Sequence, residues 1–353
     1  MEEEILQPDR TVHPAFFFAT VIVTASILLT LVYYMVDTFS PATPKIPLQH
    51  LEPQKMNGAG EYPAHVVVGL YIDKYLEFDM MKAHFELDAI VTFDFDPSHI
   101  SVYSLQNFTF DRGEIVYKSN PEIRKVDDKL RARYDIRLKV SNNFNYKFFP
   151  MDDHRFSIVL LNKTLTPADL IFETNNEHFV VGQDMSHMGW HNLRQNAEAG
   201  YLVAHMSRFG NEDILKYPAV LFTIDYARGM SMRNSATIIL PLLMMFFIAL
   251  FSLTLDANKR SDASSVISMP IQAALGLVTY RFVIESLAPK VGYLLYADYF
   301  FFLFLFLTLF ILFINILNHK MTVFMKKSCI IGFEGIAVVV FMFMLFNLSS
   351  GSY

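Results

Sequence analysis

The chain has 353 residues, of which 53% are hydrophobic and only 18% are Asp, Glu, Lys or Arg. This composition is too apolar and too poor in charge for an ordinary soluble protein, and the formal net charge of −6 gives no reason to expect nucleic-acid binding. The only cysteine, Cys329, excludes an intrachain disulfide and a Cys-based zinc site, so an exported domain must be held together by packing alone.

The first apolar segment, residues 15–36, is uncharged and long enough to span the hydrocarbon core of a bilayer. A cleaved signal peptide is the alternative, but its apolar region is usually shorter and follows basic residues, whereas three glutamates precede this one. We therefore favour a retained transmembrane anchor at 15–37 that follows a cytoplasmic N-terminus at 1–14. Prolines and glycines in residues 38–60 then indicate an extended linker.

Residues 61–230 have the pattern of a β-domain. Short stretches rich in β-branched and aromatic residues are separated by turn formers such as Asp96-Pro97 and Asn175-Asn176. The predicted strands cover 65–72, 85–95, 133–140, 155–161, 201–205 and 219–226. The pattern predicts an all-β extracytoplasmic sandwich, with a barrel as the alternative, and no useful length of helix.

Residues 231–353 contain four more apolar segments, at 235–255, 261–288, 293–317 and 329–348. The two connections with most of the basic charge fall on one side if every segment spans, and basic residues collect on the cytoplasmic side of a membrane. The β-domain is then outside the cytoplasm. We expect an integral membrane protein with an α-helical four-helix transmembrane bundle and one extra N-terminal transmembrane helix.

The second of these segments carries a stripe of mostly polar residues. They recur at steps of three or four, which places them on one face of a helix: Ser261, Ser265, Ser268, Gln272, Leu275, Thr279, Phe282 and Ser286. A membrane helix with such a face needs either a neighbouring helix or water beside it. Pro270 lies in the same segment and should kink or loosen the helix; the carbonyl it frees would be tolerated beside a water-filled pore.

A β-domain followed by four membrane helices, the second with a polar stripe, resembles the pentameric ligand-gated ion channels, the Cys-loop receptor-like family. Phe149-Pro150-Met151-Asp152-Asp153-His154 looks like the Phe-Pro-Phe-Asp-x-Gln turn of that family. Arg228 and Pro241 look like the Arg before its first pore-domain helix and the proline within that helix. Residues 275–293 resemble the outer half of the pore helix and the loop that follows.

The resemblance covers roughly residues 62–348 and is closest to the bacterial branch of the family, which lacks the disulfide. Three features depart from the family pattern. They are the N-terminal helix, the absence of a Trp-x-Pro stretch between Asp96 and Phe149, and Pro270 inside the pore helix.

The resemblance implies a homopentamer in which the striped helix of each subunit lines a pore for small ions. The pore-lining residues would be Ser265, Ser268, Gln272, Leu275, Thr279 and Phe282. Leu275 and Phe282 would form the closed gate, because narrow apolar rings exclude water. Asp262 is the selectivity candidate and, with Asp256, favours cations, although basic residues lie close to it.

The same resemblance implies a coupling interface between the β-domain and the pore, formed by Phe149, Pro150, Asp152, His154, Arg228 and Pro289. Asp152 either pairs with Arg228 or caps its own turn. His154 either confers pH modulation or makes an ordinary polar contact.

The agonist would be an unidentified small molecule or a proton. The ligand-binding candidates are Phe172, Phe209 and Tyr217, aromatic residues that could hold a cationic amine. Packing in the core is the more general role for a Phe in so Phe-rich a chain.

Two other classes of protein compete with a channel. A non-conducting membrane-anchored sensory or scaffold protein would have the same layout, and the extra helix and Pro270 favour it slightly. An enzyme is not expected, since the best candidates are only residues 152–154 and the pair His187 and His191, and we expect no cofactor or metal.

An isolated carboxylate, Glu334, lies in the last apolar segment, where we expect it to pair with Lys326 or Lys327. The expected location is a bacterial inner membrane, with membrane lipids and further copies of the chain as partners.

Overall fold

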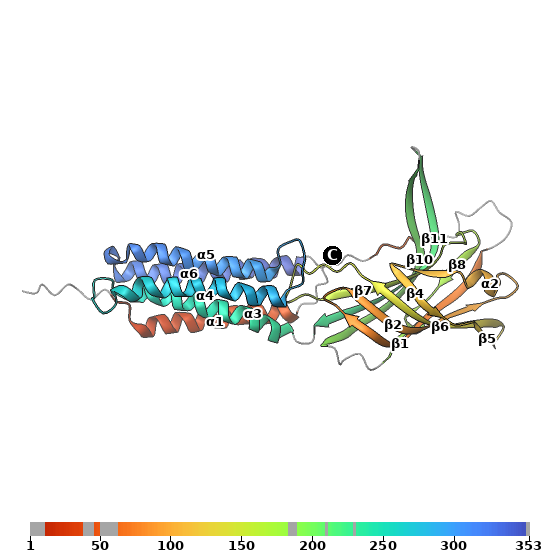
Figure 1. The fold of residues 1–353 in the computed structure, drawn as a ribbon, viewed down its shortest axis with the longest axis horizontal. Helices are drawn as coiled ribbons and strands as arrows, with labels where there is room; N and C mark the ends of the chain where they lie inside the picture. The colour runs from red at the N-terminus through yellow and green to blue at the C-terminus, as the bar shows by residue number, and fades with distance from the viewer. Residues whose placement is uncertain are drawn as a thin grey trace, which may run out of the picture. The chain divides into compact units, whose positions relative to one another are not determined.

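The computed structural model describes residues 11–37, 46–49, 63–182, 189–208, 211–228 and 231–350. The chain forms two compact units, one of long helices and one of strands (Figure 1). Residues 146–152, which we assigned to the β-domain, belong to the helical unit. The predicted linker lies mostly outside the described residues, although Gln49 within it forms a β-bridge with Tyr201.

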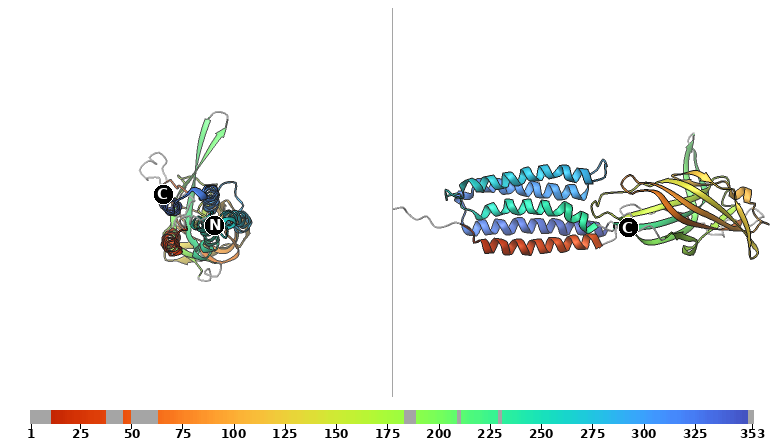
Figure 2. Two further views of the ribbon diagram at one scale, coloured as in Figure 1. Left: turned by 90° about the vertical axis from the view of Figure 1, so that its left-hand side faces the viewer. Right: turned by 60° about the horizontal axis from the view of Figure 1, so that its bottom comes forward.

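Five helices are long and apolar enough to cross a membrane, so the chain is an integral membrane protein. They are α1 (Pro14–Asp37), α3 (Ser231–Phe251), α4 (Ala263–Leu287), α5 (Tyr296–Ile316) and α6 (Val323–Ser350). Each predicted apolar segment is one of these helices. Figure 2 shows the five lying side by side as a bundle.

Helix α1 packs on α6 and α3. Its buried residues are Phe17, Thr24, Leu28, Val32 and Met35, spaced so that they form one helix face. Near its start, the Phe17 ring lies 5.2 Å from that of Phe251, and the ammonium of Lys327 lies 4.9 Å from the ring of Phe16. The predicted anchor is therefore a packed member of the bundle.

Two of the five long helices contain a proline in their interior, Pro241 in α3 and Pro270 in α4. A proline has no N–H to donate to the carbonyl four residues earlier. In α3 that carbonyl, of Thr237, accepts a hydrogen bond from the phenol of Tyr280 on α4.

In α4 the carbonyl that the proline frees belongs to Val266. It accepts a hydrogen bond of 3.0 Å from the side-chain amide of Asn315 on α5. Our prediction that water beside a pore would accommodate this carbonyl is wrong, because Pro270 and Val266 are both buried and another helix supplies the donor.

The strands form one sheet of eleven, in the order β10-β11-β7-β3-β4-β6-β2-β1-β8, with β5 paired to β6 and β9 to β1. Their bounds are β1 (Ala64–Asp79), β2 (His84–Phe95), β3 (Phe108–Asp111), β4 (Gly113–Lys118), β5 (Glu122–Val126), β6 (Lys129–Ser141), β7 (His154–Asn162), β8 (Leu170–Glu173), β9 (Phe179–Val181), β10 (Trp190–Arg208) and β11 (Asn211–Arg228). One short helix, α2 (Val102–Leu105), precedes β3. The sheet curls into a nearly closed, barrel-like form (Figure 1). The β-rich domain is confirmed, whereas a two-sheet sandwich is not.

The core of the β-domain follows from a two-residue alternation. Strand β2 alternates buried and half-buried side chains along its whole length, so one row of side chains faces inward. Phe85 and Phe93 of this row meet aromatic residues from other strands, including Phe156 of β7 at 4.6 Å from Phe85. Much of the Phe content of this domain is thus used in one core.

The hairpin of β10 and β11 is longer than the sequence predicted. The two strands pair from Trp190 with Arg228 to Arg208 with Asn211. Its tip stands out from the rest of the sheet (Figure 1). The first half of β10 is rich in polar residues, so a search for apolar stretches did not predict it as a strand.

Candidate functional site

The striped helix α4 buries the face opposite to its stripe. Its buried residues are Val266, Pro270, Ala273, Leu277 and Ile284, and both α3 and α5 pack against α4. Of the polar residues predicted to line a pore, Gln272 and Thr279 are exposed and Ser265 and Ser268 are half-buried. Within the described part of one subunit, the stripe is therefore largely uncovered by other helices.

The two residues predicted to form a gate are among the most exposed apolar residues of α4. Leu275 is 63% exposed and Phe282 is 70% exposed, whereas Leu277, two residues from the first, is completely buried. Between them, the hydroxyl of Thr279 donates to the carbonyl of Leu275 over 2.9 Å. The outer half of the stripe thus presents two large apolar side chains and a hydroxyl whose hydrogen is used within the helix.

The two acidic residues at the inner end of α4 differ in environment. Asp262 is half-buried at the start of α4 and accepts a hydrogen bond of 2.8 Å from the hydroxyl of Ser261. Asp256 is buried, and its carboxylate accepts hydrogen bonds from the backbone and side-chain amides of Asn258, both 3.0 Å long. The Asp256 carboxylate therefore stabilises the loop that contains it. Of the two acidic residues, only Asp262 then supports a preference for cations.

At the outer end of α4, Arg281 lies between two carboxylates. Its Nε is 3.2 Å from Glu285, the pair expected from their spacing. It also forms an ion pair with Asp298 of α5, which in turn accepts a hydrogen bond of 2.7 Å from the backbone of Leu295. Arg281 thus connects α4 to the start of α5. Beside it an open hollow of about 770 Å³ is lined by the loop that contains Pro289.

The Phe-Pro turn, residues 146–152, packs within the helical unit against the start of α5. Three hydrogen bonds hold it, from Tyr146 N to Tyr293 Oη (2.8 Å), from Tyr296 N to Lys147 O (2.9 Å) and from Ala297 N to Phe149 O (3.0 Å). Phe149 and Pro150 are both buried. Of the residues that follow α4, we expected Pro289 to form the contact, and these hydrogen bonds lie slightly further along the chain, at residues 293–297. Because β7 begins at His154, the turn is joined covalently to the sheet two residues later.

Arg228 ends β11 and packs on the β-domain. Its guanidinium lies 4.8 Å from the centre of the Trp190 ring, and its backbone N–H is 3.4 Å from a carboxylate oxygen of Asp153. The side chain of Asp152 is buried. A pair between Asp152 and Arg228 stays a prediction.

His154 is fully buried between aromatic rings. Its imidazole stacks on the ring of Phe144 with centroids 4.6 Å apart, and the ring of Trp190 lies 5.3 Å away. The imidazole of His154 is therefore enclosed within the β-domain.

The three aromatic ligand-binding candidates do not come together in the described residues. Phe172 is 4% exposed and belongs to the core, with its ring 6.3 Å from that of Phe93, which is the alternative role given for a Phe in this chain; ligand binding by Phe172 stays a prediction. Tyr217 is half-buried and packs against a small buried apolar cluster formed by Val159, Leu161, Ala219 and Leu221. Phe209 lies outside the described residues.

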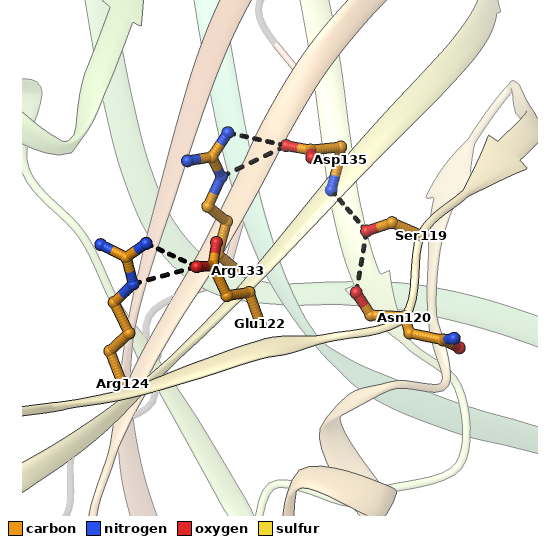
Figure 3. Close-up of polar contacts among 6 residues, drawn as sticks. All are labelled: Ser119, Asn120, Glu122, Arg124, Arg133 and Asp135. Atoms are coloured by element: carbon orange, nitrogen blue, oxygen red, sulfur yellow. Dashed lines mark hydrogen bonds and ion pairs between the residues drawn. The ribbon is translucent and has the colours of Figure 1, made fainter.

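Strands β5 and β6 carry rows of paired charges that the sequence reading missed. Arg133 donates from Nε and Nη2 to Asp135 over 3.2 and 3.0 Å, and Arg124 donates from Nε to Glu122 over 3.1 Å (Figure 3). Ser119 links this group through hydrogen bonds to Asn120 and to the backbone of Asp135 (Figure 3).

The same pattern continues on the neighbouring strand β2, where two carboxylates each bind an arginine of β6 through two hydrogen bonds. The pairs are Arg131 with Asp94 and Arg137 with Asp88. Charged residues at every second position from 131 to 139 were the available signal. Because each arginine is matched by a carboxylate, the face carries little net charge, and exposed pairs of this kind contribute only ~0–1 kcal/mol each.

Glu334 of α6 faces α1. The residue is 4% exposed, and its side chain lies beside the hydroxyls of Thr20 and Thr24 of α1. Lys326, one of the partners we expected, instead donates to the carbonyl of Leu255. Because the carboxyl Oε1 is buried with no hydrogen-bond partner among the described residues, the predicted pairing with the lysines is wrong, and the neighbouring threonines lie on a helix more than 300 residues away in the sequence.

Comparison with models of protein families and with curated proteins found no match. Among the described residues, no group of three or more His, Cys, Asp or Glu is arranged to hold a metal ion. Fold and site together define the class, an integral membrane protein with five membrane helices and a β-rich domain formed by one curled sheet.

Proposed function

We propose that the protein is a homopentameric ion channel of the pentameric ligand-gated type, with α4 lining the pore. The observation that carries this proposal is the division of α4 into a buried face and an uncovered stripe. Polar groups at membrane depth need water or another protein surface beside them. Five copies around an axis would provide a water-filled pore along the stripe.

Rings of equivalent residues would then determine conduction. Ser265, Ser268 and Gln272 would form polar rings towards the cytoplasm, where their dipoles replace part of the hydration shell of an ion. Leu275 and Phe282 would form the apolar gate, closing the pore by excluding water.

The orientation follows from charge. The basic connections between α3 and α4 and between α5 and α6 would lie in the cytoplasm and the β-domain outside it, in a bacterial inner membrane. The curled sheet corresponds in this proposal to the extracytoplasmic sandwich of the family. Asp262 favours cations, and the agonist is a small molecule or a proton.

The β-domain would act on the pore through the Phe-Pro turn. The turn is hydrogen-bonded to the start of α5 and is continuous with β7. A displacement of β7 would therefore pull on the loop that ends α4, which contains Pro289.

A non-conducting sensory or scaffold protein is the second candidate. The packing of α1 against α6 and α3 favours it, because this helix is not part of the four-helix plan. Such a protein would transmit signals through the bundle without a pore.

Purification of the full chain in detergent and imaging of single particles would test the oligomer. We expect five-fold rings, and monomers or dimers would refute the proposal. Currents across a planar bilayer then separate the two candidates, since a silent pentamer would exclude the channel and leave the sensory protein.

A further inference from the structure

Helix α4 is linked to both neighbouring helices at proline positions. Its Tyr280 donates to the carbonyl that Pro241 frees in α3, and Asn315 of α5 donates to the carbonyl that Pro270 frees in α4. Each missing backbone hydrogen bond is thus replaced by one from a side chain of the next helix.

The amide of Asn315 lies in a buried polar group. Asn315 is 2% exposed, and its Nδ2 also lies 2.6 Å from the hydroxyl oxygen of Ser252, which donates its own hydrogen to the carbonyl of Ala249. One amide therefore joins the residue that follows α3, the first turn of α4 and the end of α5. Without the Asn315 amide, the carbonyl of Val266 would have no side-chain hydrogen-bond donor among the described residues.

The consequence concerns the stiffness of α4. In a regular helix, a backbone hydrogen bond holds each turn, whereas the turn from Val266 to Pro270 is held by a side chain of another helix. The turn contains Ser268, and it separates Ser265 from Gln272 and the outer residues of the stripe. A shift of α5 would therefore change the angle between the two parts of α4.

We propose that Asn315 is a positioning residue that sets the bend of α4 at Pro270 and so determines how the inner part of the stripe is presented. The inference rests on the proposed function only where the bend is taken to set the width of the pore. The hydrogen bond between Asn315 and Val266 belongs to one subunit.

The test is a double-mutant cycle with Asn315→Leu and Pro270→Ala, measured by unfolding of the full-length protein in detergent. Asn315→Leu removes the donor at similar volume and leaves the Val266 carbonyl unpaired, so we expect a 5- to 150-fold larger unfolding constant. Pro270→Ala restores a backbone N–H for that carbonyl. In the Pro270→Ala background, Asn315→Leu should therefore raise the unfolding constant much less.

Ser252→Ala is the matched control, because it removes the other partner of the same amide but does not touch the proline position. Its effect should be the same with Pro270 and with Ala at this position. A cycle that is additive within about twofold for Asn315→Leu would overturn the proposal.

A second measurement examines the bend directly. In a Cys329→Ser background, the rate at which a thiol reagent modifies Ser268→Cys should change several-fold with Asn315→Leu and return with Pro270→Ala. An unchanged rate would refute the positioning role even if the unfolding cycle is non-additive. If both measurements agree with the proposal but no variant carries current, the channel proposal fails and the bend remains.

Discussion

Substituting Leu275 with Ser is the sharpest test of the proposed gate. In the closed pore, five copies of this side chain would repel water from a narrow ring. Serine at the same position offers a hydroxyl to water instead. We therefore expect the mutant channel to open without agonist.

The magnitude follows from the exposure of Leu275. Contact of a whole Leu side chain with water costs about 2 kcal/mol relative to burial, and 63% of this side chain is exposed in one subunit. The scaled value is about 1.3 kcal/mol per subunit and about 6 kcal/mol for a ring of five, an upper limit because the five side chains shield one another. A change of about 5.5 kcal/mol turns a 1:99 equilibrium into 99:1.

Leu277→Ser is the matched control, since it makes the same chemical change two residues away. Leu277 is completely buried, so this mutation should destabilise the subunit by at least ~2–5 kcal/mol through the lost packing. Current recorded in a planar bilayer and the unfolding midpoint in detergent distinguish the two effects. The gate assignment is refuted if Leu275→Ser leaks no more current than wild type.

Three further predictions address pH and stability. His154→Gln should flatten any pH response of the current between about pH 5 and 8, because the amide does not titrate, and an unchanged response would exclude this residue as the sensor. Hydrogen bonding to Arg137 holds the pKa of Asp88 below its usual value, so the pair stabilises the fold above about pH 4 and this contribution is lost as pH falls through the lowered pKa. Asp88→Asn should therefore lower the unfolding midpoint at pH 7 but much less at pH 3, and equal differences at both pH values would contradict the argument. Thr24→Val replaces a hydroxyl that lies beside the buried Glu334 side chain with a methyl group, and this loss of a polar neighbour should destabilise the bundle by about 1–3 kcal/mol, measured from unfolding in detergent. Thr30→Val, at an exposed position of α1, should have little effect, and similar losses from both mutants would argue against the contact.

Features set by local pattern could be predicted from the sequence. The length of each apolar segment predicted the five described helices that are long and apolar enough to cross a membrane, and the six predicted strands all lie within observed ones. The i, i+3 and i+4 spacing of the stripe correctly separated Gln272 and Thr279 from the buried Leu277. Short-range geometry alone decides these features, because a helix or strand places its side chains at fixed intervals.

Strand order and extent were harder to predict. Strands β3, β4, β5, β8 and β9 have six residues or fewer and carry too little periodicity to stand out, and the polar start of β10 resembles a loop. Whether strands form one curled sheet or two depends on which edges meet, and that is settled by long-range pairing such as β3 with β7.

The sequence by itself determined that this protein is membrane-embedded, has a β-rich domain and carries one helix with a polar stripe, because hydrophobicity and periodicity act over a few neighbouring residues. Only the tertiary structure decided which polar groups satisfy one another. Pro270 indicated an unpaired carbonyl, but the donor to that carbonyl, Asn315, lies 45 positions further along the chain. In the same way, the threonines beside Glu334 are brought there by the packing of α1 on α6. Buried polar groups take whichever partner the packed helices bring within reach, and no local pattern encodes that choice.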